Sequence, residues 1–169
     1  MTIPTLIYFN RRGRGEFIRL ILKYLKVEYN DVRIEEITDE LRSRLPYHQV
    51  PLYEDGDVTL VQSIAIARYI ANKHNFAGAT LAEKAIADSL VDSTSDTIVP
   101  FKLATQRNDE EAKNKFKSET LPKFLKAWES ALIKNGANYF VGQSYTWADV
   151  YIYYTLYFFN INGYTELVN

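Results

Sequence analysis

The sequence predicts an α+β protein in which a βαβαββα unit is followed by an all-helical segment. Strand-like and helix-like apolar patterns alternate up to about residue 75, whereas only helical periodicity appears from residue 81 onward. We therefore expect a first domain at 1–75, a linker at 76–80 and a helical domain at 81–169. A chain of 169 residues can bury a core in two such small domains without disulfides.

The first half alternates between short β-rich runs and amphipathic helical runs. We expect strands at 5–9, 27–34, 50–53 and 59–61, and helices at 17–25, 35–45 and 64–71. Asp55-Gly56-Asp57 indicates a hairpin turn, and Ser63 is expected to cap the helix that follows it. A strand-helix-strand unit favours a parallel pair, to which the hairpin adds antiparallel strands.

The second half contains three helical patterns. The first runs over 81–106 with a kink expected at Pro100, and the second over 109–134, where Pro122 is expected to kink or restart the helix. The run at 150–159 is rich in Tyr, Ile and Phe, so β-propensity alone favours a strand. However, residues 146–149 form a capping-box pattern, with Asp149 able to answer the Thr146 N–H. We therefore predict a buried helix.

Composition excludes several classes of chemistry. The chain has no cysteine, so it has no CxxC redox pair, no thiolate nucleophile and no cysteine-ligated metal. Two histidines, His48 and His74, are too few for a histidine-rich metal site, and we expect no metal. A net charge of −1 without a basic stripe argues against nucleic-acid binding. No signal peptide or membrane-spanning run is visible, so we expect a cytoplasmic protein without membrane contact.

The first candidate site is the turn that follows the first predicted strand. Tyr8 ends that strand and faces the start of the next helix, where Arg14 and the helix dipole supply positive potential. A phenolic hydroxyl in this setting can donate a hydrogen bond to a bound anion. A half-buried strand tyrosine beside a solvated arginine is nevertheless the more common arrangement, so the two residues do not define a site by themselves.

Two further segments carry backbone groups that could bind a ligand. A cis bond before Pro51 would turn the Val50 N–H and C=O outward toward a peptide-like ligand, although a trans proline starting an edge strand is more frequent. Gln62 and Ser63 precede a helix, where their side chains and the helix N–H groups could hold a carboxylate. A plain N-cap is again the more common situation.

Taken in order along the chain, these segments resemble a known family. The matching stretches are Tyr8-Phe9-Asn10-x-Arg12-Gly13-Arg14-x-Glu16-x-Ile18-Arg19, Leu45-Pro46-Tyr47-x-Gln49-Val50-Pro51, residues 62–70, 76–78 and 142–149, and Asp88, Asp92 and Asp96. They cover nearly the whole chain and are similar to cytosolic glutathione transferases, most closely the sigma class. The resemblance implies a thioredoxin-like domain followed by a helical domain, and glutathione as co-substrate.

The same resemblance implies roles for the site residues at the reacting sulfur. Tyr8 would be catalytic by donating its hydroxyl hydrogen to the glutathione sulfur, and Arg14 would favour the thiolate. Free thiols titrate near pH ~8.5, so only a small fraction is nucleophilic at neutral pH. Backbone groups of Val50, held by Pro51, would pair with the cysteinyl unit of glutathione.

The two ends of glutathione would be held by other residues of the family pattern. Gln62 and Ser63 would bind the γ-glutamyl carboxylate, and Asp96 would reach the γ-glutamyl amine across a homodimer. At the glycyl end, Arg42 stands where the family has a lysine, and Gln49 offers a neutral hydrogen bond.

This sequence departs from the family pattern in three places. A tryptophan usual in the short second helix is absent from residues 37–39, so we expect weaker glutathione binding than the family norm. Tyr47-His48 replaces an aromatic–glycine pair. The chain ends at Asn169, and we expect a helical domain that lacks its last helices. The aromatic residues expected to be more exposed than in relatives are Tyr151, Tyr154, Tyr157 and Phe158.

The function implied by the resemblance is that of a detoxifying transferase. Glutathione would be activated as a thiolate and conjugated to a small hydrophobic electrophile. Two alternatives remain open at this stage. One is a glutathione-dependent isomerase of the prostaglandin type, and the other is a non-catalytic relative that serves as a structural or binding protein.

Overall fold

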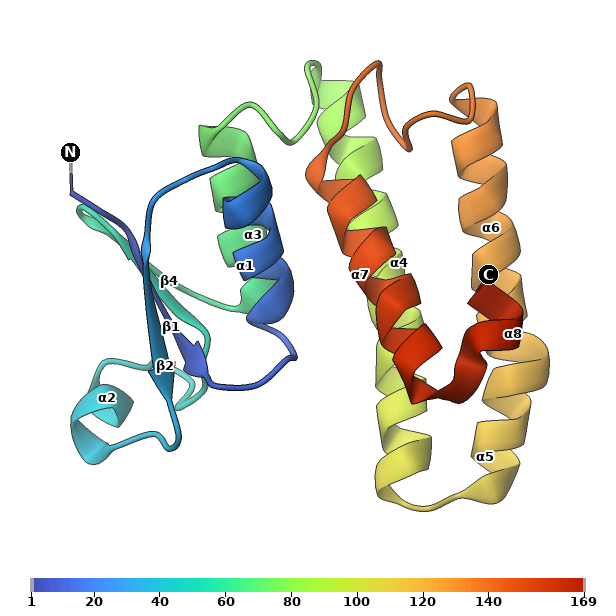
Figure 1. The fold of residues 1–169 in the computed structure, drawn as a ribbon, viewed down its shortest axis with the longest axis horizontal. Helices are drawn as coiled ribbons and strands as arrows, with labels where there is room; N and C mark the ends of the chain where they lie inside the picture. The colour runs from blue at the N-terminus through green and yellow to red at the C-terminus, as the bar shows by residue number, and fades with distance from the viewer. Residues whose placement is uncertain (1, 169) are drawn as a thin grey trace. The chain divides into compact units, whose positions relative to one another are not determined.

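The computed structural model describes residues 2–168 and confirms the predicted βαβαββα order followed by helices (Figure 1). The contacts divide the chain into two units between Phe76 and Ala77. The first unit contains β1 (Thr5–Phe9), α1 (Glu16–Tyr24), β2 (Asn30–Ile34), α2 (Asp39–Ser43), β3 (Leu52–Asp55), β4 (Val58–Val61) and α3 (Ser63–Lys73).

The four strands form one mixed sheet in the order β2-β1-β3-β4. β1 runs parallel to β2, as a strand-helix-strand unit requires, and β3 is antiparallel to both β1 and β4. The β3–β4 hairpin closes at Gly56 and Asp57, as predicted. β2 and α2 begin later than predicted: the Val27 N–H still bonds the Leu22 carbonyl of α1, and α2 starts only after its N-cap, Thr38.

Helices cover both faces of this sheet. α1 and α3 lie side by side and bury a shared set of apolar residues, while α2 lies apart from them (Figure 1). Leu41 and Leu45 of the α2 region pack with Ile7 and Leu52 of the sheet. The apolar faces of these short elements therefore account for the fold of the first unit.

The second unit is all helical. It contains α4 (Leu81–Gln106), α5 (Glu110–Lys115), the π-helical turn η1 (Phe116–Thr120), α6 (Leu121–Lys134), α7 (Trp147–Phe159), the π-helical turn η2 (Asn160–Tyr164) and α8 (Thr165–Val168). The helical pattern at 109–134 is thus divided, and α6 restarts beside Pro122, as the sequence predicted. Pro122 lies in the first turn of α6, where a missing N–H is tolerated, and η1 precedes it.

The aromatic run after Thr146 is a helix, as the capping box predicted and against β-propensity. The Asp149 carboxylate accepts hydrogen bonds from the Thr146 N–H (2.7 Å) and from the Thr146 hydroxyl (2.9 Å). It also accepts one from the Phe140 N–H at 2.9 Å. The carboxylate therefore fixes the start of α7 and the loop before it.

The aromatic residues of α7 that were expected to be more exposed than in relatives are covered to different extents in this structure. Tyr151 and Tyr154 are buried, and Tyr157 and Phe158 are half-buried. After α7 the chain turns back through η2, so that Tyr164 packs against Phe159 in one aromatic cluster. This cluster buries apolar surface that sequence reasoning left uncovered.

Candidate functional site

Tyr8 lies near the end of β1 in a cradle formed by the turn that follows the strand. Its side chain is 6% exposed, and its hydroxyl oxygen accepts a hydrogen bond from the Arg14 backbone N–H at 3.0 Å. A Cβ atom at Gly15 would lie 2.5 Å from Cγ of Tyr8, and one at Gly13 would lie 2.8 Å from the hydroxyl oxygen. The two glycines therefore let the backbone approach the ring as closely as it does.

In this geometry the oxygen of the Tyr8 hydroxyl accepts one hydrogen bond, while its hydrogen can donate another. Since the Arg14 N–H donates to the Tyr8 oxygen, the hydroxyl hydrogen is left to donate to another acceptor. The donor that approaches Tyr8 lies in the turn just before Gly15, the N-cap of α1, and the dipole of that helix favours negative charge near its start. The Arg14 side chain itself is exposed.

The sheet register brings the three sequence-predicted segments together where β1 and β4 end and β3 begins. Ile7 pairs with Leu52, and Leu52 pairs with Val61, so these residues form one row across β1, β3 and β4. Tyr8 follows Ile7, Pro51 precedes Leu52 and Gln62 follows Val61. Because β1 and β4 both run antiparallel to β3, these three positions all lie on the same side of the row, one residue further along their strands.

The Val50–Pro51 peptide bond is cis, although trans bonds are more frequent before proline. The more frequent alternative, a trans proline that starts an edge strand, does not apply, because β3 lies between β1 and β4 inside the sheet. Pro51 sits just before the strand, so its missing N–H removes no hydrogen bond between β3 and its neighbours. Val50 is buried and belongs to the same apolar cluster as Tyr8, while Gln49 is exposed.

Gln62, and not Ser63, occupies the N-cap position of α3. Ser63 is the first helical residue, so the predicted serine cap is wrong. Gln62 has φ +71° and ψ +111°, a conformation that side-chain-bearing residues rarely adopt, and it makes no side-chain cap. Strained backbone of this kind clusters at ligand-binding positions. The Gln62 side chain is exposed, which leaves its amide accessible to a ligand.

Arg42 is carried by α2 near the same apolar cluster. Its neighbour Leu41 packs with Tyr8 and Val50, which anchors the short helix beside the segments described above. The guanidinium is exposed, donates to the Ile37 carbonyl at 3.3 Å and lies 3.8 Å from the Asp39 carboxylate. These contacts at the surface are weak, so they leave Arg42 available to an anionic ligand.

Asp96 belongs to the second unit, on α4. Its side chain is exposed, and together with Asp88 and Asp92 it lines a shallow depression along one face of that helix. The spacing of four residues places all three carboxylates on the same face. The structure therefore groups the other predicted site residues in the first unit and holds Asp96 on a separate one.

Sequence reasoning assigned no role to Arg19, which the structure places next to Tyr8. Its guanidinium is 6% exposed and lies 5.7 Å from the centre of the Tyr8 ring. Burial opposes the charge, but hydrogen bonds and ion pairs with Asp31 and Glu16 outweigh it and raise the pKa of Arg19. A buried arginine with two carboxylates cannot be recognised from sequence when its partners are 3 and 12 residues away.

Titratable groups also cluster at the other end of β3. The Asp55 carboxylate accepts hydrogen bonds from the Tyr69 hydroxyl and the Lys73 ammonium. The bond to Asp55 raises the pKa of Lys73, and burial, together with the bond to Asp55, raises the pKa of Tyr69. Tyr53 nearby is fully buried, and its hydroxyl has no hydrogen-bond partner among the described residues.

The first unit has a thioredoxin-like sheet with a tyrosine near the end of β1 and a cis proline before β3, and a helical unit follows it in the chain. This is the arrangement that the sequence resemblance implies for the class of glutathione transferases. Comparison with known families agrees with that class. Residues 4–72 match the N-terminal domain of glutathione S-transferases, and residues 92–169 match the C-terminal domain. The chain therefore belongs to the glutathione S-transferase family, and its domains and relatives support a glutathione transferase enzyme.

Individual relatives cover most of the chain. A putative glutathione S-transferase alpha-2 of Dictyostelium discoideum is 41% identical over 90% of this chain and 72% of its own length. The hematopoietic prostaglandin D synthase of Homo sapiens is 38% identical over 86% of this chain and 74% of its own length. Among solved structures, a monomeric glutathione S-transferase of the hookworm Necator americanus has a TM-score of 0.86 at 31% identity, covering 99% of this chain and 84% of its own.

Two kinds of feature are missing from the part of the chain that the structure describes. In residues 2–168, no helix is both long and apolar enough to cross a bilayer. Over the same residues, no three side chains of His, Cys, Asp or Glu come together in a way that could hold a metal ion.

Proposed function

We propose that this glutathione transferase activates glutathione through Tyr8 and conjugates the thiolate to small hydrophobic electrophiles. The observation that carries the proposal is the hydrogen bond from the Arg14 N–H to the Tyr8 oxygen. It orients the phenol so that the O–H points away from the turn and toward an incoming sulfur. In a chain of hydrogen bonds each donor polarises the next, which strengthens Tyr8 as a donor.

The mechanism follows because the Tyr8 hydroxyl donates a stronger hydrogen bond to a thiolate than to a neutral thiol. A hydrogen bond from Tyr8 stabilises the thiolate more than the thiol, and positive potential from Arg14 and the start of α1 acts in the same direction. The sulfhydryl proton passes to solvent, and the thiolate attacks the electrophile. Each pKa unit by which the thiol is lowered corresponds to about 1.4 kcal/mol of preference for the thiolate.

The remaining residues at the sheet edge would bind the peptide parts of glutathione. The Val50 backbone, beside Pro51, would pair with the cysteinyl unit, as an added strand would. Gln62 and Ser63 would hold the γ-glutamyl carboxylate at the start of α3. Arg42 and Gln49 would hold the glycyl end. The strand register supports this arrangement, because Tyr8, Pro51 and Gln62 all lie one residue beyond the Ile7–Leu52–Val61 row on the same side.

We further propose that the protein is a sigma-class, cytoplasmic homodimer in which Asp96 reaches the partner's glutathione. The support is the sequence similarity to sigma-type relatives and the exposure of Asp96 on α4. Sedimentation at micromolar concentration tests the dimer. A chain that sediments only as a monomer would remove the role given to Asp96 while leaving Tyr8 untouched.

The experiment for the catalytic role compares wild type with Tyr8→Phe. The variant keeps the ring in its cradle and removes only the hydroxyl. We expect glutathione binding to change little and kcat to fall about tenfold or more, because the lost hydroxyl stabilises the reactive thiolate more than the neutral thiol. Tyr153→Phe removes an equally polar hydroxyl from an exposed position on α7 and serves as the matched control. Equal turnover in Tyr8→Phe would remove Tyr8 from the mechanism.

A second candidate reaction is glutathione-dependent isomerisation of an endoperoxide, as in prostaglandin D synthesis. It is favoured by 38% identity to the human hematopoietic prostaglandin D synthase. The same thiolate would open the peroxide bond and leave unchanged at the end. Product analysis with an endoperoxide substrate separates the two reactions, because conjugation consumes glutathione and isomerisation does not. Glutathione binding without either activity would point to a non-catalytic relative.

A further inference from the structure

Arg19 links the end of β1 to the start of α1 through its guanidinium. Its Nη2 donates to the Phe9 carbonyl at 3.3 Å, and its Nη1 donates to the Arg11 carbonyl at 3.4 Å. Both carbonyls belong to the segment that directly follows Tyr8. The side chain thus contacts the backbone that leads from Tyr8 to the Arg14 N–H, which in turn bonds the Tyr8 hydroxyl.

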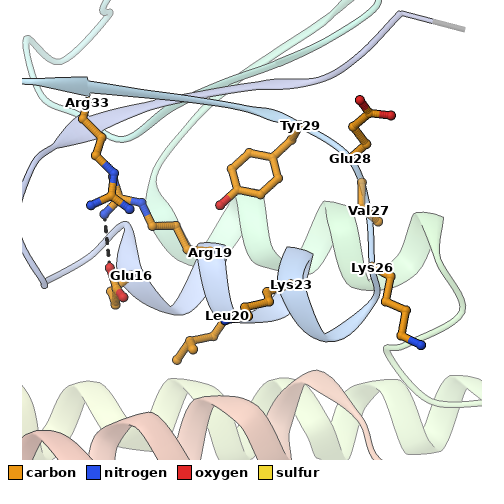
Figure 2. Close-up of a pocket in the computed structure, with 9 residues that line it drawn as sticks. All are labelled: Glu16, Arg19, Leu20, Lys23, Lys26, Val27, Glu28, Tyr29 and Arg33. Atoms are coloured by element: carbon orange, nitrogen blue, oxygen red, sulfur yellow. Dashed lines mark hydrogen bonds and ion pairs between the residues drawn. The ribbon is translucent and has the colours of Figure 1, made fainter.

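Two carboxylates from different elements hold this guanidinium in place. Nε donates to Asp31 of β2 at 2.9 Å, and Nη1 donates to Glu16 of α1 at 3.1 Å, the latter pair being dashed in Figure 2. Asp31 is itself held by Arg33, whose Nε lies 2.9 Å from its second oxygen. Charge-assisted bonds to a planar donor fix direction as well as distance.

We infer that Arg19 is a positioning residue for Tyr8, acting through the backbone of residues 9–11; this inference rests on the proposed function. Arg19 itself takes no part in the chemical steps of the reaction. It lies against the Tyr8 ring and bonds the carbonyls of Phe9 and Arg11, away from the hydroxyl. Its effect is to hold the turn so that the Arg14 N–H stays 3.0 Å from the Tyr8 oxygen.

The geometry requires a guanidinium and not merely a positive charge. The four acceptors are Asp31, Glu16, and the carbonyls of Phe9 and Arg11, and they surround a planar fork with five N–H donors. A lysine ammonium is a compact point charge and cannot reach all four. Arg19→Lys therefore keeps the charge between the carboxylates while releasing the turn.

Arg19 also lines an open pocket between α1 and the segment 26–33 (Figure 2). The pocket measures about 530 Å³ and is lined by Glu16, Tyr29 and Arg33 as well as Arg19 (Figure 2). Truncation of Arg19 would leave a guanidinium-sized space beside two carboxylates, with a path from solvent. A small guanidinium ion should therefore be able to enter and replace the lost group.

The main experiment measures kcat, the KM for glutathione and the thiolate titration of bound glutathione in Arg19→Lys. We expect kcat to fall about tenfold or more, because small displacements at a reacting group have large effects on rate. We expect the thiolate midpoint to move toward that of free glutathione, with KM changed less than about threefold. Arg44→Gln is the matched control, since it removes an arginine from an ion pair with Glu54 in the same unit, and Glu54 pairs with Thr5 at the end of β1 opposite the turn. A lysine variant with wild-type kcat and thiolate midpoint, or an equal loss in Arg44→Gln, would overturn the inference.

Rescue provides a readout that a merely structural role would not give. Millimolar guanidinium chloride, far below the concentrations that unfold proteins, should restore activity several-fold in Arg19→Ala and leave Tyr8→Phe unchanged. A folded Arg19→Ala variant that is not rescued argues against the role. If neither Arg19 variant folds, Glu16→Ala decides, because it removes one of the two carboxylates that hold the guanidinium: we expect kcat to fall, and an unchanged kcat would overturn the inference.

Failure of this inference can be told apart from failure of the proposed function. A wild-type chain whose bound glutathione titrates like free glutathione refutes the activation by Tyr8, whatever the Arg19 variants do. A wild-type chain with a lowered thiol pKa that Arg19→Lys retains refutes only the positioning role.

Discussion

The Arg14 backbone N–H donates a 3.0 Å hydrogen bond to the hydroxyl oxygen of Tyr8, which ties the end of β1 to the turn that precedes α1. The phenol is thereby oriented before any ligand binds. Preorganised donors of this kind lose little free energy to reorientation during the reaction. The proposed activation of glutathione depends on that relationship, and several variants test it.

Gly15→Ala should disturb Tyr8 by steric pressure alone. Gly15 has an ordinary φ of −85°, so an alanine is not strained there, but its Cβ would lie 2.5 Å from the Tyr8 ring. We expect a loss of about 1–3 kcal/mol in the free energy of unfolding, and a fall in kcat of about tenfold. Urea unfolding and steady-state kinetics measure both.

The control for that variant is Gly136→Ala. Gly136 has φ +91°, and no atom lies within 4 Å of the place where a Cβ would stand, so the cost of alanine is backbone strain without a clash. We expect a stability loss of about 1 kcal/mol and unchanged kcat. A Gly15→Ala variant that behaves like this control would show that the Tyr8 cradle is not tight.

His48→Gly should stabilise the fold. His48 has φ +52°, a left-handed conformation that costs about 1 kcal/mol for a residue with a Cβ atom. Glycine adopts it freely, although it also gains entropy in the unfolded state, so we expect a net gain of about 0.5 kcal/mol. The midpoint of urea unfolding should rise. A decrease would mean that the imidazole makes a favourable interaction that outweighs the strain.

Alkaline pH should destabilise the first unit through Tyr53, Tyr69 and Lys73. Burial raises the pKa of Tyr53 and Tyr69, and the bond to Asp55 raises the pKa of Lys73. Since these folded-state pKa values lie above the unfolded ones, the stabilising contribution is complete below pH ~10 and is lost as pH rises through the folded-state values. The free energy of unfolding should therefore be lower above pH ~10 than at pH ~8.

Tyr53→Phe should reduce that dependence and stabilise the protein near pH ~8, below the range in which tyrosine titrates. The Tyr53 hydroxyl is buried without a partner among the described residues, so its removal relieves an unsatisfied polar group, a gain of about 1 kcal/mol. Tyr69→Phe is the comparison, because it removes a hydroxyl that does bond Asp55. If Tyr53→Phe is as destabilising as Tyr69→Phe, the Tyr53 hydroxyl has a partner in solution, such as a water.

Asp149→Ala should destabilise the helical unit. The carboxylate accepts three hydrogen bonds, two from Thr146 and one from the Phe140 N–H. Loss of the cap alone costs about 1 kcal/mol, and the Phe140 N–H loses its partner as well. We expect about 2 kcal/mol in total by chemical unfolding. Glu83→Ala removes the corresponding carboxylate from the exposed box at Thr80 and should cost less.

Much of the fold could be predicted because local patterns and tertiary structure agree. The strand at 5–9, the hairpin at Gly56 and the helix after Thr146 all carry strong local signals, and the structure confirms each of them. Local signals failed where long-range contacts decide. The bond before Pro51 is cis where trans is more frequent, and a π-helical turn that no local signal indicated precedes the restart of the helix near Pro122.

The candidate site shows the same limit. Tyr8, Val50 and Gln62 could be selected from sequence because each lies where an element ends or begins, and the register places them at one edge. Arg19 and Gly15 could not be, since their roles depend on Asp31 and on the Tyr8 ring in three dimensions. The left-handed backbone at Gln62 likewise leaves no signal in a glutamine.

The measurement that tests the central claim most directly is the ultraviolet thiolate absorbance of glutathione bound to this protein, followed against pH. Tyr8→Phe is measured beside the wild type. We predict a wild-type midpoint at least about one unit below the free thiol value near pH ~8.5, and loss of that shift in the variant. Identical midpoints in the two proteins, or a wild-type midpoint near the free value, would contradict the role of Tyr8 as the group that activates glutathione.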